Sequence, residues 1–226
     1  MIDIIFQNEN FVVCNKPGGV LSVPSRDRHD PRGCLGIELQ RHLNQSVLPV
    51  HRLDLEVSGL IVFALNPKAH KKSQDWFEKK TISKLYIATT SEQNFSHWPE
   101  QINTIRDTLD MNDNKVLIWK TQIQRGKKRS FESTHGEWAE TKAQIQTVKD
   151  GHVHWHLYPL TGKPHQLRLE LSRRGFPVHG DQLYGSKVKT PDQAGISLKA
   201  VRLDLTYVPD RLGLPQQINL KDEINI

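Results

Sequence analysis

The chain has 226 residues, of which 36% are hydrophobic and 25% charged, and its formal net charge is +6 at pH 7. No apolar run reaches the ~18–20 residues that span a bilayer, the N-terminus lacks the basic start of a signal peptide, and two cysteines are too few for a disulfide framework. We therefore expect a cytoplasmic protein with one large domain or two small ones, whose basic character is typical of proteins that bind a polyanion.

The first fifty residues predict a β-hairpin and then a helix. The polar residues 7–10 separate two short apolar runs, residues 4–6 and 11–14, as a hairpin turn would. Further on, Asp30 and Pro31 suit the N-cap and the first position of a helix. Its apolar face is marked by leucines at a spacing of four, and Pro49 stops it: Leu35, Leu39 and Leu43.

A buried strand and a basic helix follow. Residues 59–64 are apolar and rich in β-branched side chains, and the run is too short for a helix. Asn66 and Pro67 then predict the start of a helix that runs to about Lys80. Five lysines cover its polar faces, either as a solvated surface or as a surface that follows phosphates: Lys68, Lys71, Lys72, Lys79 and Lys80.

Most of the second half alternates between apolar and polar residues, which predicts strands. These patterns cover residues 84–88, 115–123, 140–148, 152–160 and 196–205, and the third and fourth form a hairpin over residues 149–151. Residues 91–114 have no clear pattern. The basic segment Arg125–Arg129 begins a polar stretch to Trp138 that we predict to be an inserted, flexible loop.

Residues 164–175 are ambiguous between a strand and a helix. Their leucines alternate, but Pro164 near the start and Gly175 after the end are helix boundaries, which favours a helix. With few helices and mostly antiparallel neighbours, the chain is predicted to be an α+β protein. Its core would be a mixed, mainly antiparallel sheet with helices and loops packed on it.

Three histidines alternate with apolar residues between residues 152 and 157. On a strand His152, His154 and His156 point to one side, in an arrangement that a metal ion could use. Their apolar neighbours must point to the core, however, and no acidic or thiol ligand is close in sequence. We therefore predict that the histidines face water or RNA, and we expect no metal site.

The residues that could carry chemistry are few. The chain has no glycine-rich phosphate loop, no Cys-x-x-Cys, no nucleophile-elbow serine and no His-Glu-x-x-His helix. Arg52 and Asp54 lead directly into the predicted strand, where they form either a catalytic site on a rigid scaffold or an ordinary surface pair. The other polar residues in turns or at element ends are Tyr86, His165, Arg168, Asp181 and Tyr184.

Six motifs in order give the chain a resemblance to a known family. Together they resemble the RluA-like pseudouridine synthases. They are Asn15–Val20, His51–Asp54 with Ser58–Leu60, Lys84–Ala88, Ala139–Thr141, Thr161–Gly162 with His165–Arg168, and Gly180–Gly185. The resemblance implies the pseudouridine synthase fold, with a central active-site cleft, an RNA substrate, and no cofactor or metal.

The resemblance also implies roles for individual residues. Asp54 matches the catalytic aspartate, Tyr86 matches the tyrosine that lies against the target uracil, and Arg168 matches the arginine that pairs with the aspartate. Leu198 matches the family's apolar residue near the C-terminal strand. Three positions depart from the family pattern and affect substrate contacts more than chemistry: Val57, Lys163 and Lys199.

The expected substrate is a stem-loop of large-subunit ribosomal RNA or of transfer RNA. Arg52 and His165 are candidate substrate contacts, and the basic segment would add Arg125, Lys127, Lys128 and Arg129. We expect residues 1–226 to form one catalytic domain without the small N-terminal RNA-binding domain of the S4 type, and to act as a monomer that needs no membrane. The alternative is a basic RNA-binding module that has lost catalysis.

Overall fold

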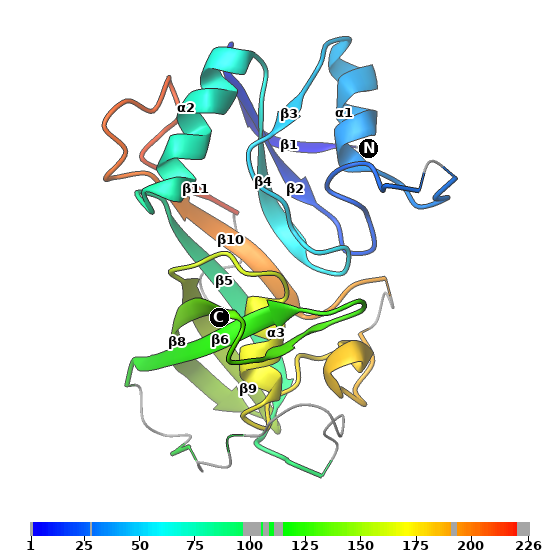
Figure 1. Ribbon diagram of the computed structural model, residues 1–226, viewed down its shortest axis with the longest axis vertical. Helices are drawn as coiled ribbons and strands as arrows, with labels where there is room; N and C mark the ends of the chain where they lie inside the picture. Colours follow the sequence, from blue (N-terminus) through cyan, green and yellow to red (C-terminus); the bar gives the residue numbers. More distant parts are fainter. Residues whose placement is uncertain are drawn as a thin grey trace. The chain divides into compact units, whose positions relative to one another are not determined.

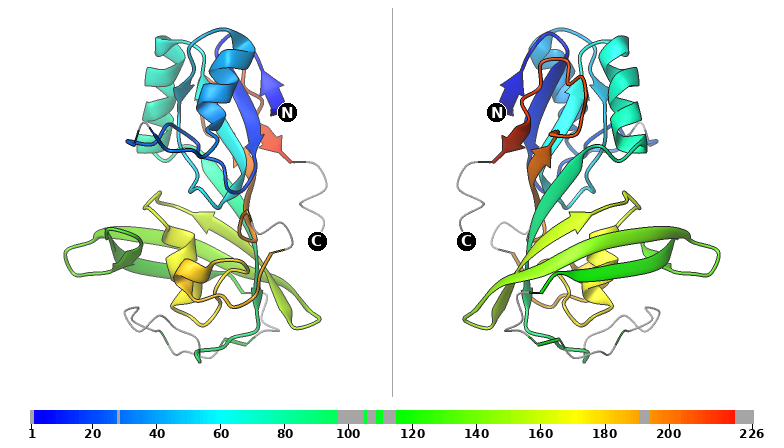
Figure 2. Two further views of the ribbon diagram at one scale, coloured as in Figure 1. Left: turned by 90° about the vertical axis from the view of Figure 1, so that its right-hand side faces the viewer. Right: turned by 90° about the vertical axis from the view of Figure 1, so that its left-hand side faces the viewer.

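The computed structural model describes residues 2–27, 29–96, 105, 109–110, 115–190 and 194–220. It divides into two compact units (Figures 1 and 2). The first unit comprises Met1–Lys84 and Lys199–Asn225, and the second comprises Leu85–Leu198. Within the described ranges, no helix combines the length and the apolar composition that crossing a membrane requires.

The first unit is built on a mainly antiparallel sheet. Its central strand β4 pairs antiparallel with β2 and β3 and parallel with β10, while β1 pairs with β2 and β11 with β10. The predicted N-terminal hairpin is therefore confirmed. The strands are β1 (Asp3–Gln7), β2 (Phe11–Lys16), β3 (Leu48–Pro49), β4 (Ser58–Ala64), β10 (Leu198–Asp204) and β11 (Gln217–Asn219).

Gly59 permits the close parallel pairing of β4 with β10. Gly59 is opposite Ala200 and has a φ of +111°. A Cβ atom at this position would lie 2.2 Å from the carbonyl oxygen of Ala200. Only glycine fits such an approach, because it has no Cβ and tolerates positive φ.

Two helices lie within the described residues of this unit. The helix α2 (Pro67–Glu78) begins where the sequence predicted, since the Asn66 side chain accepts a hydrogen bond from the Ala69 amide at 2.9 Å. The helix α1 (Leu35–Leu43), however, does not begin at Pro31. Asp30 instead accepts hydrogen bonds from the amide and the guanidinium of Arg32, which holds this segment as a turn.

The core of the first unit lies between α2 and the sheet. Trp76 of α2 packs with apolar side chains from β2, β4, β10 and the C-terminal stretch, including Phe11, Leu60, Leu203 and Ile218. Burial of each such side chain contributes roughly 1.5–3 kcal/mol. The C-terminal stretch after Pro209 thus supplies core residues as well as β11.

The described residues of the second unit form a five-stranded antiparallel sheet in the order β5-β9-β8-β6-β7. The predicted hairpin is confirmed: β8 and β9 are joined by Asp150 and Gly151, both with positive φ. The strands are β5 (Ser83–Ser91), β6 (Leu117–Arg125), β7 (Ser130–Glu132), β8 (Glu137–Lys149) and β9 (His152–Pro159).

Strand alternation divides the side chains of this sheet between two faces. The face with Ile123 and Ala139, here called the inner face, packs against Leu169 of the helix α3 (Gln166–Ser172). The predicted helix in residues 164–175 is therefore confirmed. On β9 the residues Val153, Trp155 and Leu157 are buried, while the three histidines point to the opposite, outer face, as predicted.

The segment 125–138 is not the flexible loop that we expected. The strand β6 continues to Arg125, residues 126–129 form a tight turn closed by a hydrogen bond from the Gly126 amide to the Arg129 carbonyl, and β7 then pairs with β6. Both backbone groups of Ser130 also bond to the hydroxyl of Tyr184, 54 residues away. Such distant contacts leave no signal in the local sequence pattern.

The helix α3 is entirely buried although it contains charged residues. The charged side chains of α3 and of the two residues that follow it each form an ion pair. Arg168 pairs with Asp181, Glu170 with Arg174, and Arg173 with Glu132. The Arg174 guanidinium also lies over the Trp119 ring at 4.5 Å. Buried charges require such pairing, because an unpaired ion in the interior costs several kcal/mol, on the order of its desolvation penalty.

Candidate active site

Asp54 lies on the loop that joins β3 to β4 in the first unit. Its side chain is half-buried, whereas Arg52 is exposed. The loop turns tightly after Asp54, since the Val57 amide donates to the Asp54 carbonyl at 3.2 Å. Val57 itself is buried, so the loop is attached to the core immediately before β4 begins. A polar group on such a support has a defined position.

The buried ammonium of Lys16 anchors this loop through hydrogen bonds to backbone carbonyls. Lys16 is 0% exposed, and its Nζ donates to the carbonyl oxygens of Pro17 at 2.9 Å, Val20 at 2.8 Å and Leu55 at 3.1 Å. Burial lowers the pKa of Lys16 to about 8, although the nearby carboxylates of Asp54 and Glu56 oppose that shift. The lysine therefore joins the turn after β2 to the residue that follows Asp54.

Two further side chains hold the loop on the other side of Asp54. The Ser22 hydroxyl donates to the Leu53 carbonyl at 2.8 Å and accepts from the Leu53 amide at 3.0 Å. The His51 Nε2 accepts a hydrogen bond from the Val62 amide at 3.2 Å, which requires that nitrogen to be unprotonated. Burial, reinforced by the charge of Lys84, lowers the pKa of His51 to about 3.

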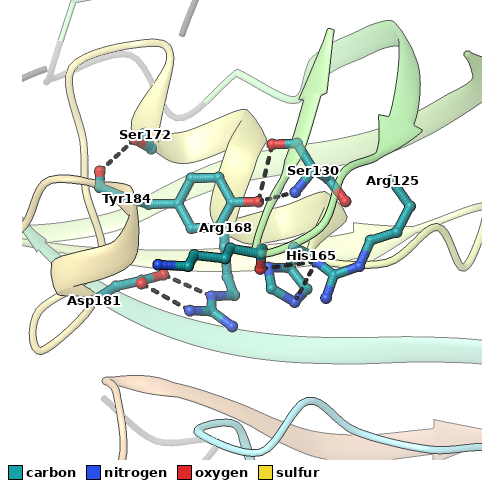
Figure 3. A network of polar contacts seen from close by, with 8 residues as sticks. Arg125, Ser130, His165, Arg168, Ser172, Asp181 and Tyr184 are labelled. Atoms are coloured by element: carbon teal, nitrogen blue, oxygen red, sulfur yellow. Dashed lines mark hydrogen bonds and ion pairs between the residues drawn. The ribbon is translucent and has the colours of Figure 1, made fainter. Parts of the chain in front are cut away.

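Arg168 in the second unit forms a bidentate ion pair with Asp181 (Figure 3). Its Nε donates to Oδ2 at 2.7 Å and its Nη2 donates to Oδ1 at 2.8 Å, and each side chain is 1% exposed. The guanidinium carbon also lies 5.3 Å from the centre of the Tyr184 ring. The orientation of Arg168 is thus fixed by the segment that contains Gly180–Gly185.

Tyr184 connects this segment to β7 and α3. Its hydroxyl accepts from the Ser130 amide at 2.8 Å and donates to the Ser130 carbonyl at 3.1 Å (Figure 3). Its own carbonyl accepts from the Ser172 hydroxyl at 2.5 Å. Tyr184 ends the short 3₁₀ helix η1 (Gln182–Tyr184) and is 0% exposed, so it acts as a structural support for Arg168.

His165 and Arg125 are in contact next to Tyr184. His165 precedes α3 with a left-handed backbone, φ +52°, and its ring lies 5.7 Å from that of Tyr184. The Arg125 Nη1 is 3.1 Å from the His165 Nε2 (Figure 3). Since a guanidinium can only donate, Nε2 accepts and the ring proton is on Nδ1. Strand alternation explains the contact, because Arg125 is on the same face of β6 as Ile123.

The remaining predicted site residues are in different environments. Tyr86 is half-buried on β5 and is opposite Leu157, which places it on the inner face. Leu198 is 2% exposed at the start of β10. Lys127 and Lys128 are exposed on the tight turn, and Arg129 is half-buried.

Asp54 belongs to the first unit, while Tyr86 and Arg168 belong to the second. The ion pair between Asp54 and Arg168, and the cleft that would contain Asp54, Tyr86 and Arg168, therefore stay predictions. Among the described residues, no group of three or more His, Cys, Asp or Glu side chains is arranged to hold a metal ion.

Sequence reasoning did not assign the supporting roles of Lys16 and Asp181. Both lie within motifs that the family resemblance contains, Asn15–Val20 and Gly180–Gly185. The signal for Lys16 is a charged residue at the end of an otherwise buried strand. The signal for Asp181 is an acidic residue in a loop bracketed by glycines, and it indicates a partner only when the position of Arg168 is known.

Comparison with known proteins identifies the family of the chain. The family model described as RNA pseudouridylate synthase matches residues 10–173. The dual-specificity RNA pseudouridine synthase RluA of Escherichia coli is 30% identical over 205 residues, which cover 90% of this chain and 86% of that protein. The uncharacterized RNA pseudouridine synthase MG209 homolog of Mycoplasma pneumoniae is 29% identical, over 91% of this chain and 62% of that protein.

The fold is also found in a solved structure. Human RNA pseudouridylate synthase domain containing 1 is 22% identical, with a TM-score of 0.68, over 92% of this chain and 80% of that one. This likeness confirms the predicted α+β fold. The family model and the similarity to RluA confirm the family that the motifs predicted. The chain belongs to the RNA pseudouridylate synthase family, and it is an RluA-like RNA pseudouridine synthase.

Proposed function

We propose that this protein isomerises specific uridines to pseudouridine in structured RNA, with Asp54 as the catalytic carboxylate. In this reaction the N1–C1′ bond breaks, the base turns, and a C5–C1′ bond forms. The proton on C5 leaves and N1 gains a proton, so the composition of the RNA does not change. No electron transfer takes place, and side chains alone can supply the acid and base groups.

The observation that supports Asp54 most strongly is how its loop is held. Lys16 binds the carbonyl of the residue after Asp54, and Ser22 binds both backbone groups of the residue before it. An ordinary surface aspartate does not need three such anchors from a buried lysine and a buried serine. A catalytic carboxylate does, because small displacements of a reacting group reduce the rate strongly.

Three roles for the Asp54 carboxylate are compatible with isomerisation. It attacks C1′, it attacks the uracil ring, or it removes the 2′ proton. Each role requires the ionised form, and a guanidinium near a carboxylate favours that form by lowering its pKa. Arg168 is the proposed source of that positive charge, and its two hydrogen bonds to Asp181 hold its guanidinium in a fixed orientation.

The target base must leave its stack before it can react, which costs a few kcal/mol, on the order of one base pair's stacking. A pocket with an aromatic or apolar wall offsets that cost. We assign this role to Tyr86, whose hydroxyl is also a candidate for accepting the C5 proton, and to Leu198. His165 and Arg52 are proposed contacts to the RNA around the target nucleotide.

The proposed substrate is a stem-loop of large-subunit ribosomal RNA, of transfer RNA, or of both. The net charge of +6 and the exposed lysines of the turn support a polyanionic substrate. The relatives named RluA are described as dual-specificity enzymes, which supports more than one RNA target. We propose that the protein works in the cytoplasm as a monomer, without a cofactor or a metal.

Pseudouridine mapping tests this proposal. Total RNA from cells with and without the gene is treated to reveal pseudouridines, and the sites that disappear are then reproduced with the purified protein and transcribed RNA. We expect loss of specific sites in the cell and their restoration by the wild-type protein but not by Asp54→Asn. If the protein binds these RNAs and forms no pseudouridine, it is an RNA-binding module without catalysis and the proposal fails.

A further inference from the structure

The outer face of β6, β7 and β8 has a tryptophan that the fold does not bury. Trp138 is 63% exposed on β8. The other tryptophans in the described part of the chain, Trp76, Trp119 and Trp155, are each at most 5% exposed. A large apolar ring in water contributes little to folding, so packing does not account for Trp138.

A second aromatic ring and two amide side chains share this face. The strand β6 pairs with β7 on one side and with β8 on the other, with Gln124 opposite Phe131 and Gln122 opposite Trp138. Directly opposite residues point to the same face of a sheet. From the spacing of strands and residues, the Cα atoms of Phe131 and Trp138 are about 12 Å apart, with the two glutamines between them.

The charges around these rings are mostly positive. Lys120 and Lys142 point to the same face, opposite Glu140 and Ile118 respectively, and both lysines are exposed. Glu140 is the acidic residue among these outer-face positions, and its carboxylate lies 3.6 Å from Lys120. Beyond the end of β6, the tight turn adds the exposed lysines Lys127 and Lys128.

Aromatic rings, amides and lysines on one face are suited to bind unpaired RNA. Aromatic side chains stack on any base, amide groups bond to base edges, and lysines bind the phosphates between them. A protein partner would favour a continuous apolar surface, whereas here two glutamines separate the rings. Neither glutamine extends the apolar area. Gln124 offers a donor and an acceptor to a base, whereas the Gln122 amide nitrogen already donates to the Thr134 and Gly136 carbonyls, so Gln122 contributes its oxygen as an acceptor.

We propose that this outer-face patch, formed by Phe131, Gln122, Gln124, Trp138, Lys120 and Lys142, binds unpaired nucleotides of the RNA substrate. The patch rests on the proposed function in that the RNA it holds is the RNA that the enzyme modifies. It lies on the opposite side of the sheet from Tyr86, which is on the inner face. The bound nucleotides are therefore separate from the target uridine, and they add to the selection of the substrate.

Substitutions at Trp138 test the patch. Trp138→Ala removes the ring, Trp138→Phe keeps an aromatic face, and Trp138→Leu keeps apolar area without one. Binding is measured with a fluorescein-labelled oligouridine and with a structured RNA that the wild-type protein modifies. We expect Trp138→Ala and Trp138→Leu to raise Kd about 5- to 100-fold, the loss of one stacked base, and Trp138→Phe to stay within about 3-fold. The rate at saturating RNA should be unchanged.

Further readouts separate the possible failures. All three variants should keep the wild-type circular dichroism spectrum and Tm, since the ring is exposed. Oligouridine should quench the wild-type tryptophan fluorescence, and this quenching should be absent in Trp138→Phe. If Trp138→Leu binds as well as Trp138→Phe, or Trp138→Ala binds as well as the wild type, the patch is not a stacking site. If no RNA is modified by the wild type while the Kd changes hold, the proposed function fails and the RNA-binding patch stands.

Discussion

Arg168 donates two parallel hydrogen bonds to Asp181, and both side chains are almost completely removed from water. The pair joins α3 to the loop before η1, entirely within the second unit. If Arg168 acts on Asp54, it does so with a guanidinium whose orientation is already fixed by its hydrogen bonds to Asp181. The proposed catalytic arginine therefore depends on Asp181 for its orientation.

Removal of the Asp181 charge should destabilise the protein strongly. Asp181→Asn leaves a buried guanidinium without its counter-ion, so we expect the free energy of unfolding to fall by about 3–5 kcal/mol, measured by urea denaturation. The matched control is Glu137→Gln, which breaks the exposed pair with Lys163 and should change stability little. In the cycle with Arg168→Leu and Asp181→Leu, the double variant should lose much less than the sum of the singles. Additive losses would show that the pair is not coupled.

Asp54→Asn should abolish turnover and leave RNA binding within a few-fold of the wild type. The amide preserves the shape of the side chain but lacks the negative charge and the basic oxygen that each proposed role needs. Single-turnover assays and binding to the same RNA separate the two effects. The neighbouring Glu56→Gln is the control, since it removes a charge from the same loop and should retain activity. Activity of Asp54→Asn at a few per cent of wild type would remove Asp54 from the mechanism.

Local sequence patterns predicted the elements whose signals are short-range. The β8–β9 hairpin follows from strict alternation around Asp150 and Gly151, and α2 follows from the cap at Asn66. The start of α1 was wrong because Asp30 bonds to Arg32 and competes with the helix for that backbone. The short strands β7 and β11 were missed because contacts with residues distant in sequence, and not a local pattern, determine where they form. For β7 the decisive contact is with Tyr184, far along the chain.

The site was predictable only in part, for the same reason. Asp54, Tyr86 and Arg168 were predicted as site residues because their motifs match a family in order, and these roles stay predictions. The resemblance paired Arg168 with Asp54, whereas the buried partner that the structure shows, Asp181, was not assigned, because a sequence does not show which carboxylate a guanidinium reaches. Arg125 was grouped with the lysines of the turn, whereas strand alternation directs it to the inner face and to His165.

The lysines of the turn should be tested apart from Arg125. If Lys127, Lys128 and Arg129 bind phosphates, their replacement by Ala should weaken RNA binding and reduce the slope of log Kd against log salt by about 0.7–0.9 for each lost contact. The control removes three exposed charges of α2 and its C-cap instead, at Lys68, Lys71 and Lys79. Equal effects of the two triple variants would mean either that net charge alone is responsible or that the lysines of α2 also bind phosphates, and in both cases the turn would have no special role. An unchanged slope for the turn variant would make the turn an ordinary solvated loop.

His51 should make the protein less stable in mild acid. The folded state holds its pKa near 3, against an ordinary value of 6.5, so between these values the unfolded state binds more protons. Stability that is present above pH 6.5 is therefore lost as the pH falls toward 3. His51→Gln keeps an acceptor for the Val62 amide and does not titrate. Between pH 7 and pH 5 the wild type should lose up to about 2 kcal/mol more than this variant in urea denaturation. Equal losses would contradict the lowered pKa of His51.

Lys16 should add stability as the pH rises through the alkaline range. Its pKa is about 8 in the folded state and 10.5 ordinarily, so between these values the unfolded state binds more protons and stability rises with pH. Lys16→Met lacks this titration. The difference in free energy of unfolding between the wild type and this variant should therefore grow by about 3 kcal/mol from pH 8 to pH 10.5. Parallel curves would show that the ammonium is not buried.

The same variant tests whether Lys16 positions Asp54. Methionine fills the space of the lysine stem but donates no hydrogen bond to the carbonyls of Pro17, Val20 and Leu55. The Asp54 loop then loses an anchor, so we expect the turnover rate at saturating RNA to fall at least about 10-fold while Kd for RNA stays near the wild-type value. Lys149→Met, at an exposed position, is the control. A fall confined to stability, with full turnover in the remaining folded protein, would show that Lys16 supports the fold and not the position of the carboxylate.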